Sequence, residues 1–329
     1  MTFGATILDA SELRLSKDEA RFFREADPFG FILFARNIDT PDQIYALCSD
    51  MRDAVGRDAP IMIDQEGGRV QRLRGPTWYE WTPPLDFVRQ AGDDAPRAMY
   101  LRYLRIASEL RALSIDANCA PMVDLPIDDA HEFLKNRCYS ADVGAIGEIG
   151  RSVANGLLDG GVLPVLKHIP GHGRATQDSH IELPVIEAEL EELIETDFVP
   201  FKVLNDLPMG MTAHIRVSAV DDAPATLSKD MMALIRNEIG FDGLIMTDDI
   251  SMKALSGTVE QITVQSLAAG CDVVLLCNAS LEERIACANA AGAMNDEAQR
   301  RAEAAIDARK VPDEIDIAEL DAELEALLA

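Results

Sequence analysis

The chain has 329 residues, 48% of them hydrophobic, and a formal net charge of −27 at pH 7. A chain of this length can bury one large core or two medium ones. The acidic excess argues against nucleic-acid and membrane partners, because binding either requires clustered Lys and Arg. No segment is long and apolar enough to span a bilayer, and the N-terminal MTFGATILDASELRLS has no secretory-signal pattern. We therefore expect a soluble, cytoplasmic protein, and we expect it to be monomeric.

Eight short apolar runs recur along the chain, each followed by a polar loop and a helical pattern. This alternation is typical of repeated βα units, and the near-continuous apolarity suits parallel strands buried on both faces. The sequence predicts an α/β fold in which residues 1–329 form one domain, a (β/α)8 barrel of the TIM type. This prediction leaves room for irregular first strands and for an extra helix after about Pro312. The predicted strands are Gly4–Ile7, Gly30–Phe34, Pro60–Ile63, Asn118–Met122, Val162–Leu166, Gly210–Ala213, Gly243–Met246 and Val273–Leu276.

Capping residues mark several predicted helix starts. A Ser or Thr followed three residues later by Glu or Gln can satisfy free N–H groups of the first turn. Glycines after two apolar helical patterns then predict helix ends that lead into the next strand. The starts are at Ser16, Thr40, Ser228 and Ser280, and the ends are at Gly240 and Gly270.

Charged and imidazole side chains gather at the C-terminal ends of the predicted strands. In an α/β barrel these ends converge on one mouth, whereas the residues before the strands show no comparable pattern. Carboxylates, guanidinium groups, an ammonium and imidazoles suit a ligand with many hydroxyls, because each hydroxyl can donate and accept. The residues are Asp64, Arg69, Arg72, Asp124, Arg137, Lys167, His168, His214, Asp248 and Asp249.

The segment from Leu163 to Pro184, LPVLKHIPGHGRATQDSHIELP, holds three of the five histidines. Within it, Asp178 lies two residues before His180. Such a carboxylate can hold one imidazole nitrogen and raise the basicity of the ring, so that the other nitrogen can transfer a proton near neutral pH. An Asp-x-His triplet on a polar loop is more often an ordinary surface feature, but its closeness to KHIPGHG favours a catalytic pair.

Two adjacent carboxylates, Asp248 and Asp249, follow the seventh predicted strand. Neighbouring side chains on an extended chain point in different directions, so they are not expected to share one task. We predict that Asp248 is the reactive carboxylate and that Asp249 forms hydrogen bonds in the loop or at a helix start. The alternative is that both only cap the following helix.

Lys167 ends the fifth predicted strand, where an unpaired buried ammonium would lose its proton. Its partner is therefore a ligand hydroxyl or a carboxylate, either Asp64 or Asp124. Arg72 and Arg137 have the same two interpretations, since each can bind a ligand or brace a loop. A desolvated lysine can also form a Schiff base, so a barrel lyase that uses Lys167 is an alternative enzyme. A sugar-binding barrel without catalysis is a further alternative.

A zinc site built from His168, His172, His180 and Asp248 has enough ligands, but Pro170 prevents the first two histidines from sharing a helix face. We therefore expect no metal and no cofactor, and we interpret His172 as a residue that folds the loop. The six cysteines show no CxxC spacing and are predicted to be reduced core residues.

The run KHIPGHGRATQDSH resembles the KH(F/I)PGHG...DSH signature of glycoside hydrolase family 3, and MTDDISM resembles the nucleophile motif of that family. Five further runs, GFILFARN, IDQEGGRVQRL, NRCYS, MTAH and AGCDVVLLCN, are similar in the expected order to the NagZ-type bacterial β-N-acetylglucosaminidases of the family. The resemblance extends from about Gly4 to Asn278 and implies a single-domain barrel.

The resemblance implies that Asp248 is the nucleophile, His180 the general acid/base and Asp178 its partner. It also implies cleavage of N-acetylglucosamine from 1,6-anhydro-N-acetylmuramyl peptides during cell-wall recycling, with retention of configuration. Water and phosphate remain alternative acceptors, and cleavage of β-glucosides remains open. The residues implied to bind the terminal sugar are Asp64, Arg72, Arg137, Lys167 and His168, and we add His214 because its strand ends at the same mouth.

Overall fold

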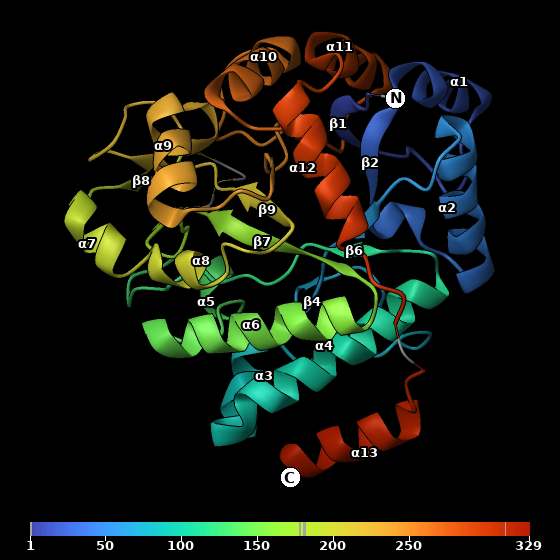
Figure 1. Cartoon of the computed structure of the whole chain (residues 1–329). Coiled ribbons are helices and arrows are strands. Elements are labelled where there is room, and N and C mark those ends of the chain that lie inside the picture. Colours follow the sequence, from blue (N-terminus) through green and yellow to red (C-terminus); the bar gives the residue numbers. More distant parts are fainter. Residues whose placement is uncertain (1, 178, 180–181, 313) are drawn as a thin grey trace.

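The structure is a computed structural model that describes residues 2–177, 179, 182–312 and 314–329. The predicted catalytic pair, Asp178 and His180, lies outside the described residues. The rest of the chain forms a ring of parallel strands with helices around it (Figure 1). This is the predicted (β/α)8 barrel.

All eight predicted barrel strands are present, and each pairs in parallel with its neighbours. A parallel bridge between Met246 and Val273 brings the last two strands together and closes the ring. The pairing register shifts between β1 and β2 and again between β7 and β9, so irregularity is not confined to the first strands. The strands are β1 (Gly4–Asp9), β2 (Pro28–Leu33), β3 (Ile61–Ile63), β6 (Ala117–Asn118), β7 (Leu163–Ile169), β9 (Met209–Thr212), β11 (Leu244–Met246) and β12 (Val274–Leu276).

Two small sheets lie on the loops and were not predicted from the sequence. The strands β4 (Gln65–Gly67) and β5 (Val70–Gln71) form an antiparallel hairpin directly after β3. The strands β8 (Val185–Ile186) and β10 (Arg216–Val217) pair in parallel. The runs are too short to show a period-2 pattern, which explains why the sequence gives no signal for them.

The helices begin where the predicted caps lie. Ser16 and Ser280 form complete capping boxes, and the side chains of Thr40 and Ser228 accept backbone N–H groups of the first turn. The helices are α1 (Lys17–Ala26), α2 (Pro41–Val55), α3 (Pro84–Ala91), α4 (Ala95–Ala112), α5 (Glu132–Lys135), α6 (Val143–Asp159), α7 (Leu190–Glu195), α8 (Val199–Val203), α9 (Lys229–Leu234), α10 (Val259–Ala269), α11 (Leu281–Ala291), α12 (Asp296–Asp307) and α13 (Ile317–Leu327), with a π-helical turn, Ile235–Ile239, after α9.

Helix α12 covers the N-terminal end of the barrel and crosses in front of the strands in Figure 1. Its buried face consists of Ala298, Ala302 and Ala305, which pack with side chains from the inside of the barrel. Alanine allows the helix backbone to approach the strands closely, and overpacking such a contact with a larger side chain typically costs about 1–3 kcal/mol. The helix therefore closes one end of the barrel and leaves the other end for a site.

The predicted C-terminal helix is α13, which packs on the outside of α4 rather than against the strands (Figure 1). Ion pairs from Arg97 to Glu323 and from Arg105 to Asp321 connect the two helices. All six cysteines are buried and form no disulfide, as predicted.

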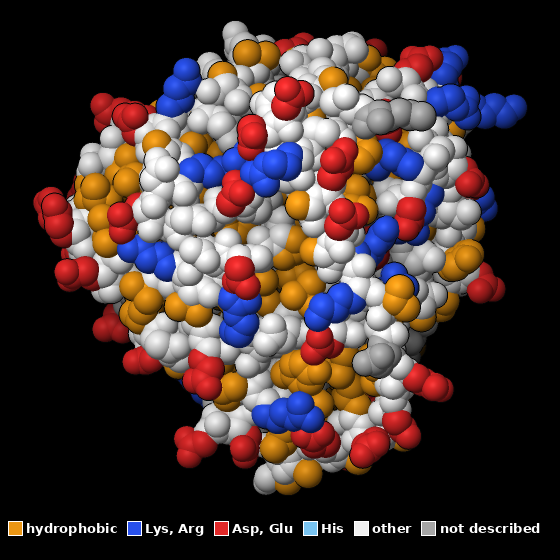
Figure 2. Space-filling model, in the orientation of Figure 1, with side chains coloured by type: hydrophobic (Ala, Val, Ile, Leu, Met, Phe, Trp, Pro, Cys, Tyr) orange, Lys and Arg blue, Asp and Glu red, His pale blue; other side chains and the backbone are white. Residues whose placement is uncertain are grey.

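The face shown in Figure 2 carries acidic side chains around its edge, with basic side chains distributed among them. Many basic side chains of the protein are paired with carboxylates, as in the pairs from Arg300 and Arg301 to Asp242. Within the described ranges of the chain, none of the helices combines the length and apolarity that a bilayer crossing requires.

Candidate active site

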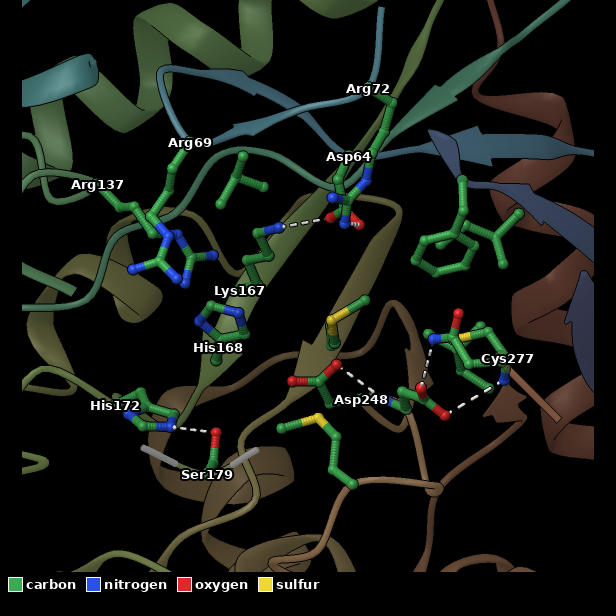
Figure 3. A pocket seen from close by; sticks show the side chains of 18 of the residues that line it. Asp64, Arg69, Arg72, Arg137, Lys167, His168, His172, Ser179, Asp248 and Cys277 are labelled. Carbon is green, nitrogen blue, oxygen red and sulfur yellow. Dashed lines mark hydrogen bonds and ion pairs between the residues drawn. The ribbon is translucent and has the colours of Figure 1, made fainter. Parts of the chain in front are cut away.

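The C-terminal ends of the strands enclose a pocket of about 260 Å³. Among the residues that line it are eight of the ten side chains predicted at the mouth, and they come from different strands and loops (Figure 3). These eight are Asp64, Arg69, Arg72, Arg137, Lys167, His168, Asp248 and Asp249. The strand ends therefore bring these side chains together around one pocket.

Asp64 joins two of the pocket cations. One carboxylate oxygen accepts from Lys167 Nζ at 3.0 Å and the other accepts from Arg72 Nη2 at 2.9 Å. Burial opposes ionisation of Asp64, but the charges of Lys167 and Arg72 lower its pKa below the usual range. The carboxylate is therefore ionised, and it holds both cations at the edge of the pocket.

Lys167 has a second carboxylate partner, Glu66, whose Oε1 lies 2.7 Å from Nζ. Burial alone would lower the pKa of Lys167, but Glu66 and Asp64 raise it above its usual value. The ammonium therefore keeps its proton at neutral pH. A Schiff-base lysine must lose that proton to attack a carbonyl, so this geometry disfavours the lyase alternative.

Arg137 forms a bidentate ion pair with Glu66, with Nε–Oε2 and Nη2–Oε1 distances of 2.9 and 2.8 Å. The sequence analysis did not single out Glu66, which lies in the EGG run two residues after Asp64. Arg72 and Arg137 both pair with carboxylates and both line the pocket, so each braces a loop and also faces a ligand.

Asp124 organises the imidazoles of the fifth loop. Its Oδ2 lies 2.7 Å from His168 Nδ1, and its Oδ1 accepts the backbone N–H of His172 at 2.7 Å. Burial opposes ionisation of Asp124, but His168 and His172 lower its pKa to about 2. An ionised carboxylate at Nδ1 places a proton on that nitrogen and makes Nε2 the one available to a ligand. Asp124 is thus the partner of His168 and not of Lys167, whose two carboxylate partners are the predicted Asp64 and the unpredicted Glu66.

Asp248 follows β11 and Thr247, and it lines the pocket opposite the cations. Burial would raise its pKa, but His214, His168 and the Asp249 backbone N–H lower it below the usual value. The donated N–H of Asp249 lies 2.8 Å from Oδ1. Asp248 is therefore an ionised carboxylate directed into the pocket.

Asp249 also lines the pocket, but its carboxylate forms the loop hydrogen bonds that were predicted for it. Its oxygens accept the N–H and hydroxyl of Ser251 at 3.0 and 2.7 Å and the N–H of Cys277 at 3.2 Å. The next helix, α10, begins at Val259 and is capped by Thr258. The alternative in which both aspartates cap a following helix is therefore wrong.

His214 is fully buried and lies beside Asp248 rather than in the pocket wall that the structure describes. Its Nδ1 lies 2.8 Å from the hydroxyl of Thr226, and its Nε2 lies 3.1 Å from the carbonyl of Asp249. Both ring nitrogens are thus occupied. The contact between His214 and the ligand stays a prediction.

His172 and Ser179 line the pocket on the loop that carries the predicted catalytic pair. Their side chains meet at 3.2 Å, between Nε2 and Oγ (Figure 3). Burial lowers the pKa of His172 to about 4, so the ring is neutral at pH 7. His172 therefore folds the loop, as predicted, and also forms part of the pocket wall.

Apolar side chains complete the pocket, and the sequence analysis missed them. The ring of Phe34 contacts two guanidinium groups, with Arg36 Cζ 5.0 Å and Arg72 Cζ 5.2 Å from the ring centroid. Met211 and Met252 line another part of the wall. In the described part of the chain, no group of three or more His, Cys, Asp or Glu could hold a metal ion.

The fold and the site indicate the class of protein to which this chain belongs. An α/β barrel whose mouth combines an ionised carboxylate with cations, imidazoles and apolar side chains is suited to bind and cleave a carbohydrate. Residues 7–311 match the family model of the glycosyl hydrolase family 3 N terminal domain. This chain belongs to glycoside hydrolase family 3.

Two similar proteins indicate which glycosidic bond the enzyme cleaves. The chain is 38% identical to the β-hexosaminidase of Methylobacillus flagellatus over 84% of this chain and 81% of the relative. It is 34% identical to that of Thiobacillus denitrificans over 84% of this chain and 79% of the relative. The protein is thus a glycoside hydrolase with β-N-acetylhexosaminidase activity.

Solved structures agree with this result. NagZ from Neisseria gonorrhoeae superimposes with a TM-score of 0.84 at 26% identity, over 100% of this chain and 96% of that chain. A family 3 β-N-acetylglucosaminidase from Paenibacillus sp. str. FPU-7 gives 0.85 at 29% identity, over 98% of this chain and 67% of that chain. The NagZ structure has also been determined in complex with N-trifluoroacetyl-D-glucosamine.

Proposed function

We propose that the protein is a retaining exo-β-N-acetylglucosaminidase that works through a covalent glycosyl-enzyme. The observation that carries this proposal is the ionised Asp248 in a pocket whose other walls hold Lys167, Arg72 and His168. Asp248 is the proposed nucleophile, since a carboxylate of lowered pKa can attack the anomeric carbon at neutral pH.

The proposed acid/base pair is His180 with Asp178. Ser179 links these two residues in the chain and lines the same pocket as Asp248, which supports their assignment to one site. In the first step, Asp248 attacks C1 through an oxocarbenium-like transition state while protonated His180 gives its proton to the leaving oxygen. In the second, neutral His180 activates water and the β-configured sugar is released.

The proposed sugar contacts are Asp64, Arg72, Arg137, Lys167 and His168. The first four are ionised groups, and charge-assisted hydrogen bonds are shorter and stronger than those between neutral groups. Asp64 and the two guanidinium groups offer acceptors and donors in fixed positions, which suits the hydroxyls and the N-acetyl oxygen of one terminal sugar.

We further propose that the natural substrates are N-acetylglucosaminyl 1,6-anhydro-N-acetylmuramyl peptides in cytoplasmic cell-wall recycling. The signature motifs of the fifth loop and the similarity to NagZ along 96% of that chain support this assignment. We also propose that the chain acts as one catalytic domain and as a monomer.

The test is product analysis with an N-acetylglucosaminyl anhydromuramyl peptide, with and without phosphate. We expect free N-acetylglucosamine, formed first as the β-anomer and seen by proton NMR. Initial formation of the α-anomer would contradict the double displacement, because a single displacement inverts C1. N-acetylglucosamine 1-phosphate formed only with phosphate would show that phosphate is an acceptor.

The two alternatives from the sequence lose support. Lys167 is held protonated between Asp64 and Glu66, so we expect no borohydride-trapped adduct at this lysine with carbonyl substrates. The family and its β-hexosaminidase relatives indicate an enzyme rather than a sugar-binding barrel.

A further inference from the structure

Glu66 lies behind the pocket and is not among the residues that line it. It belongs to β4, and its side chain is only 1% exposed. Its two oxygens nevertheless contact two of the cations that do line the pocket, Lys167 and Arg137. One buried carboxylate therefore supports two groups that face the ligand.

This carboxylate completes a chain of alternating charges. The order is Arg72, Asp64, Lys167, Glu66 and Arg137, with each neighbouring pair within 3.0 Å. Burial opposes the charge of Glu66, but Arg137 and Lys167 lower its pKa to about 2. Without its negative charge, two cations that now share one oxygen atom would repel each other across a low-dielectric region.

The backbone around Glu66 is held firmly. Its carbonyl accepts from Arg102 Nη2 at 2.6 Å, and Arg102 is fully buried against aromatic rings. The preceding Gln65 exchanges two hydrogen bonds with the side chain of Asn118, at 3.0 and 3.1 Å. The following Gly67 has φ +107°, and a Cβ there would overlap the Arg102 guanidinium. The EGG run thus places the carboxylate with little freedom.

We propose that Glu66 is a positioning residue for sugar binding, which sets the separation and orientation of the Lys167 ammonium and the Arg137 guanidinium without touching the substrate. Groups that bind a ligand must be held within about 0.5 Å of their productive positions by the residues that support them. This inference rests on the proposed function insofar as Lys167 and Arg137 bind the sugar.

The chain offers a matched control at the other end of the barrel. Asp272 is 4% exposed and bridges Arg236 and Arg301, at 2.6 and 3.0 Å. These two cations come from the π-helical turn and from α12, which covers the N-terminal end of the barrel, and neither they nor Asp272 line the pocket. Asp272→Asn removes a buried bridging carboxylate in the same way as Glu66→Gln, but does so away from the sugar.

The experiment measures the dissociation constant of N-acetyl-D-glucosamine by titration calorimetry and KM for 4-nitrophenyl N-acetyl-β-D-glucosaminide. Neither quantity depends on the fraction of folded protein once the active concentration is fitted. We expect Glu66→Gln to raise both by about tenfold or more, because two charged ligand contacts are disturbed. Asp272→Asn should lower the melting temperature. It should leave the dissociation constant and KM within about twofold of the wild-type values, because substitutions at distant sites act independently.

Glu66→Asp is the second variant, in case Glu66→Gln does not fold. It keeps the charge but is one methylene shorter and cannot reach both cations, so we expect a smaller rise of about threefold in both constants. Unchanged constants in whichever Glu66 variant folds would overturn the inference. A wild type that binds N-acetyl-D-glucosamine normally but does not hydrolyse the aryl glycoside would instead overturn the proposed function, and the calorimetric comparison of Glu66 variants would still stand.

Discussion

The two ends of the barrel use the same interaction for different purposes. At the C-terminal mouth, Glu66 bridges Lys167 and Arg137. At the N-terminal end, Asp272 bridges Arg236 and Arg301. Asp116 also bridges Arg52 and Arg309 at that end.

The ion pairs at the two ends differ in their surroundings. At the N-terminal end the carboxylates also accept strand N–H groups, since Asp272 binds the N–H of Ile245 at 2.8 Å and Asp116 binds that of Ile61 at 2.7 Å. Helix α12 covers this end. At the mouth, the cations line an open pocket. Ion pairs at one end thus fasten helices to strands, whereas ion pairs at the other end hold charged groups ready for a ligand.

The largest expected effect is the loss of turnover when Asp248, in the pocket at the mouth, is substituted. Asp248→Asn removes the proposed nucleophile, and we expect kcat on an aryl N-acetylglucosaminide to fall by roughly 10⁴-fold or more. Among the described residues no cation pairs directly with Asp248, so the free energy of unfolding should change by about 1 kcal/mol or less. Steady-state kinetics with urea denaturation measures both, and normal turnover would remove Asp248 from the mechanism.

Asp272→Asn should give the opposite result at the other end of the barrel. Breaking a buried ion pair on one side typically costs about 3–5 kcal/mol, because the remaining charges lack a partner. We expect a loss of that size in unfolding free energy, with kcat unchanged per folded molecule. A large fall in kcat of the folded variant would show that the two ends are coupled.

The pH dependence of stability tests one residue of the mouth, the buried imidazole of His172. Burial lowers the pKa of His172 from 6.5 to about 4, so between these values the folded state binds fewer protons than the unfolded state. The contribution of His172 to the free energy of unfolding should therefore be fully present above pH 6.5. It should be lost as the pH falls towards 4, which lowers the free energy of unfolding by roughly 3 kcal/mol. Denaturation of the wild type and of His172→Gln at several pH values measures this component. Equal slopes for the two proteins would contradict it.

The smallest expected effect concerns the loop of the proposed acid/base pair. Ser179→Ala removes the contact between its hydroxyl and His172 Nε2. The net value of such a bond is about 1 kcal/mol, so we expect kcat/KM to fall about fivefold for substrates with poor leaving groups. Activated aryl substrates need less protonation and should be affected less. Equal losses on both substrates would indicate a general disturbance of the pocket.

The fold could be predicted because its signal is local. Each barrel strand is a continuous apolar run, and capping residues separate the runs into units, so all eight strands were recovered. The small hairpin β4–β5 is too short to show a pattern. The role of α12 was missed because the pattern of alanines at Ala298, Ala302 and Ala305 shows that one helix face is buried, but not which surface it covers.

The site was predicted only in part, for a different physical reason. Strand ends show which residues reach the mouth, but they do not show which carboxylate holds which cation. Glu66 and Arg137 are 71 residues apart in sequence, and Asp124, which was a candidate partner of Lys167, binds His168 instead. At the N-terminal end, Asp116 and Arg309 are 193 residues apart. The expectation that the residues before the strands carry no charge pattern was wrong, because Asp116 comes directly before β6 and Asp272 comes two residues before β12, and both bind cations. The rotation of His214 behind Asp248 depends on the contact with Thr226, which is equally non-local.

The central claim is that Asp248 forms a covalent bond to the sugar. The most direct measurement is mass spectrometry of a peptide digest after reaction with an activated 5-fluoro N-acetylglucosaminyl analogue, which slows hydrolysis of the intermediate. The account predicts a glycosyl adduct on the peptide that contains Asp248, with fragmentation placing it on that side chain. An adduct on Asp64 or on another carboxylate would contradict the account.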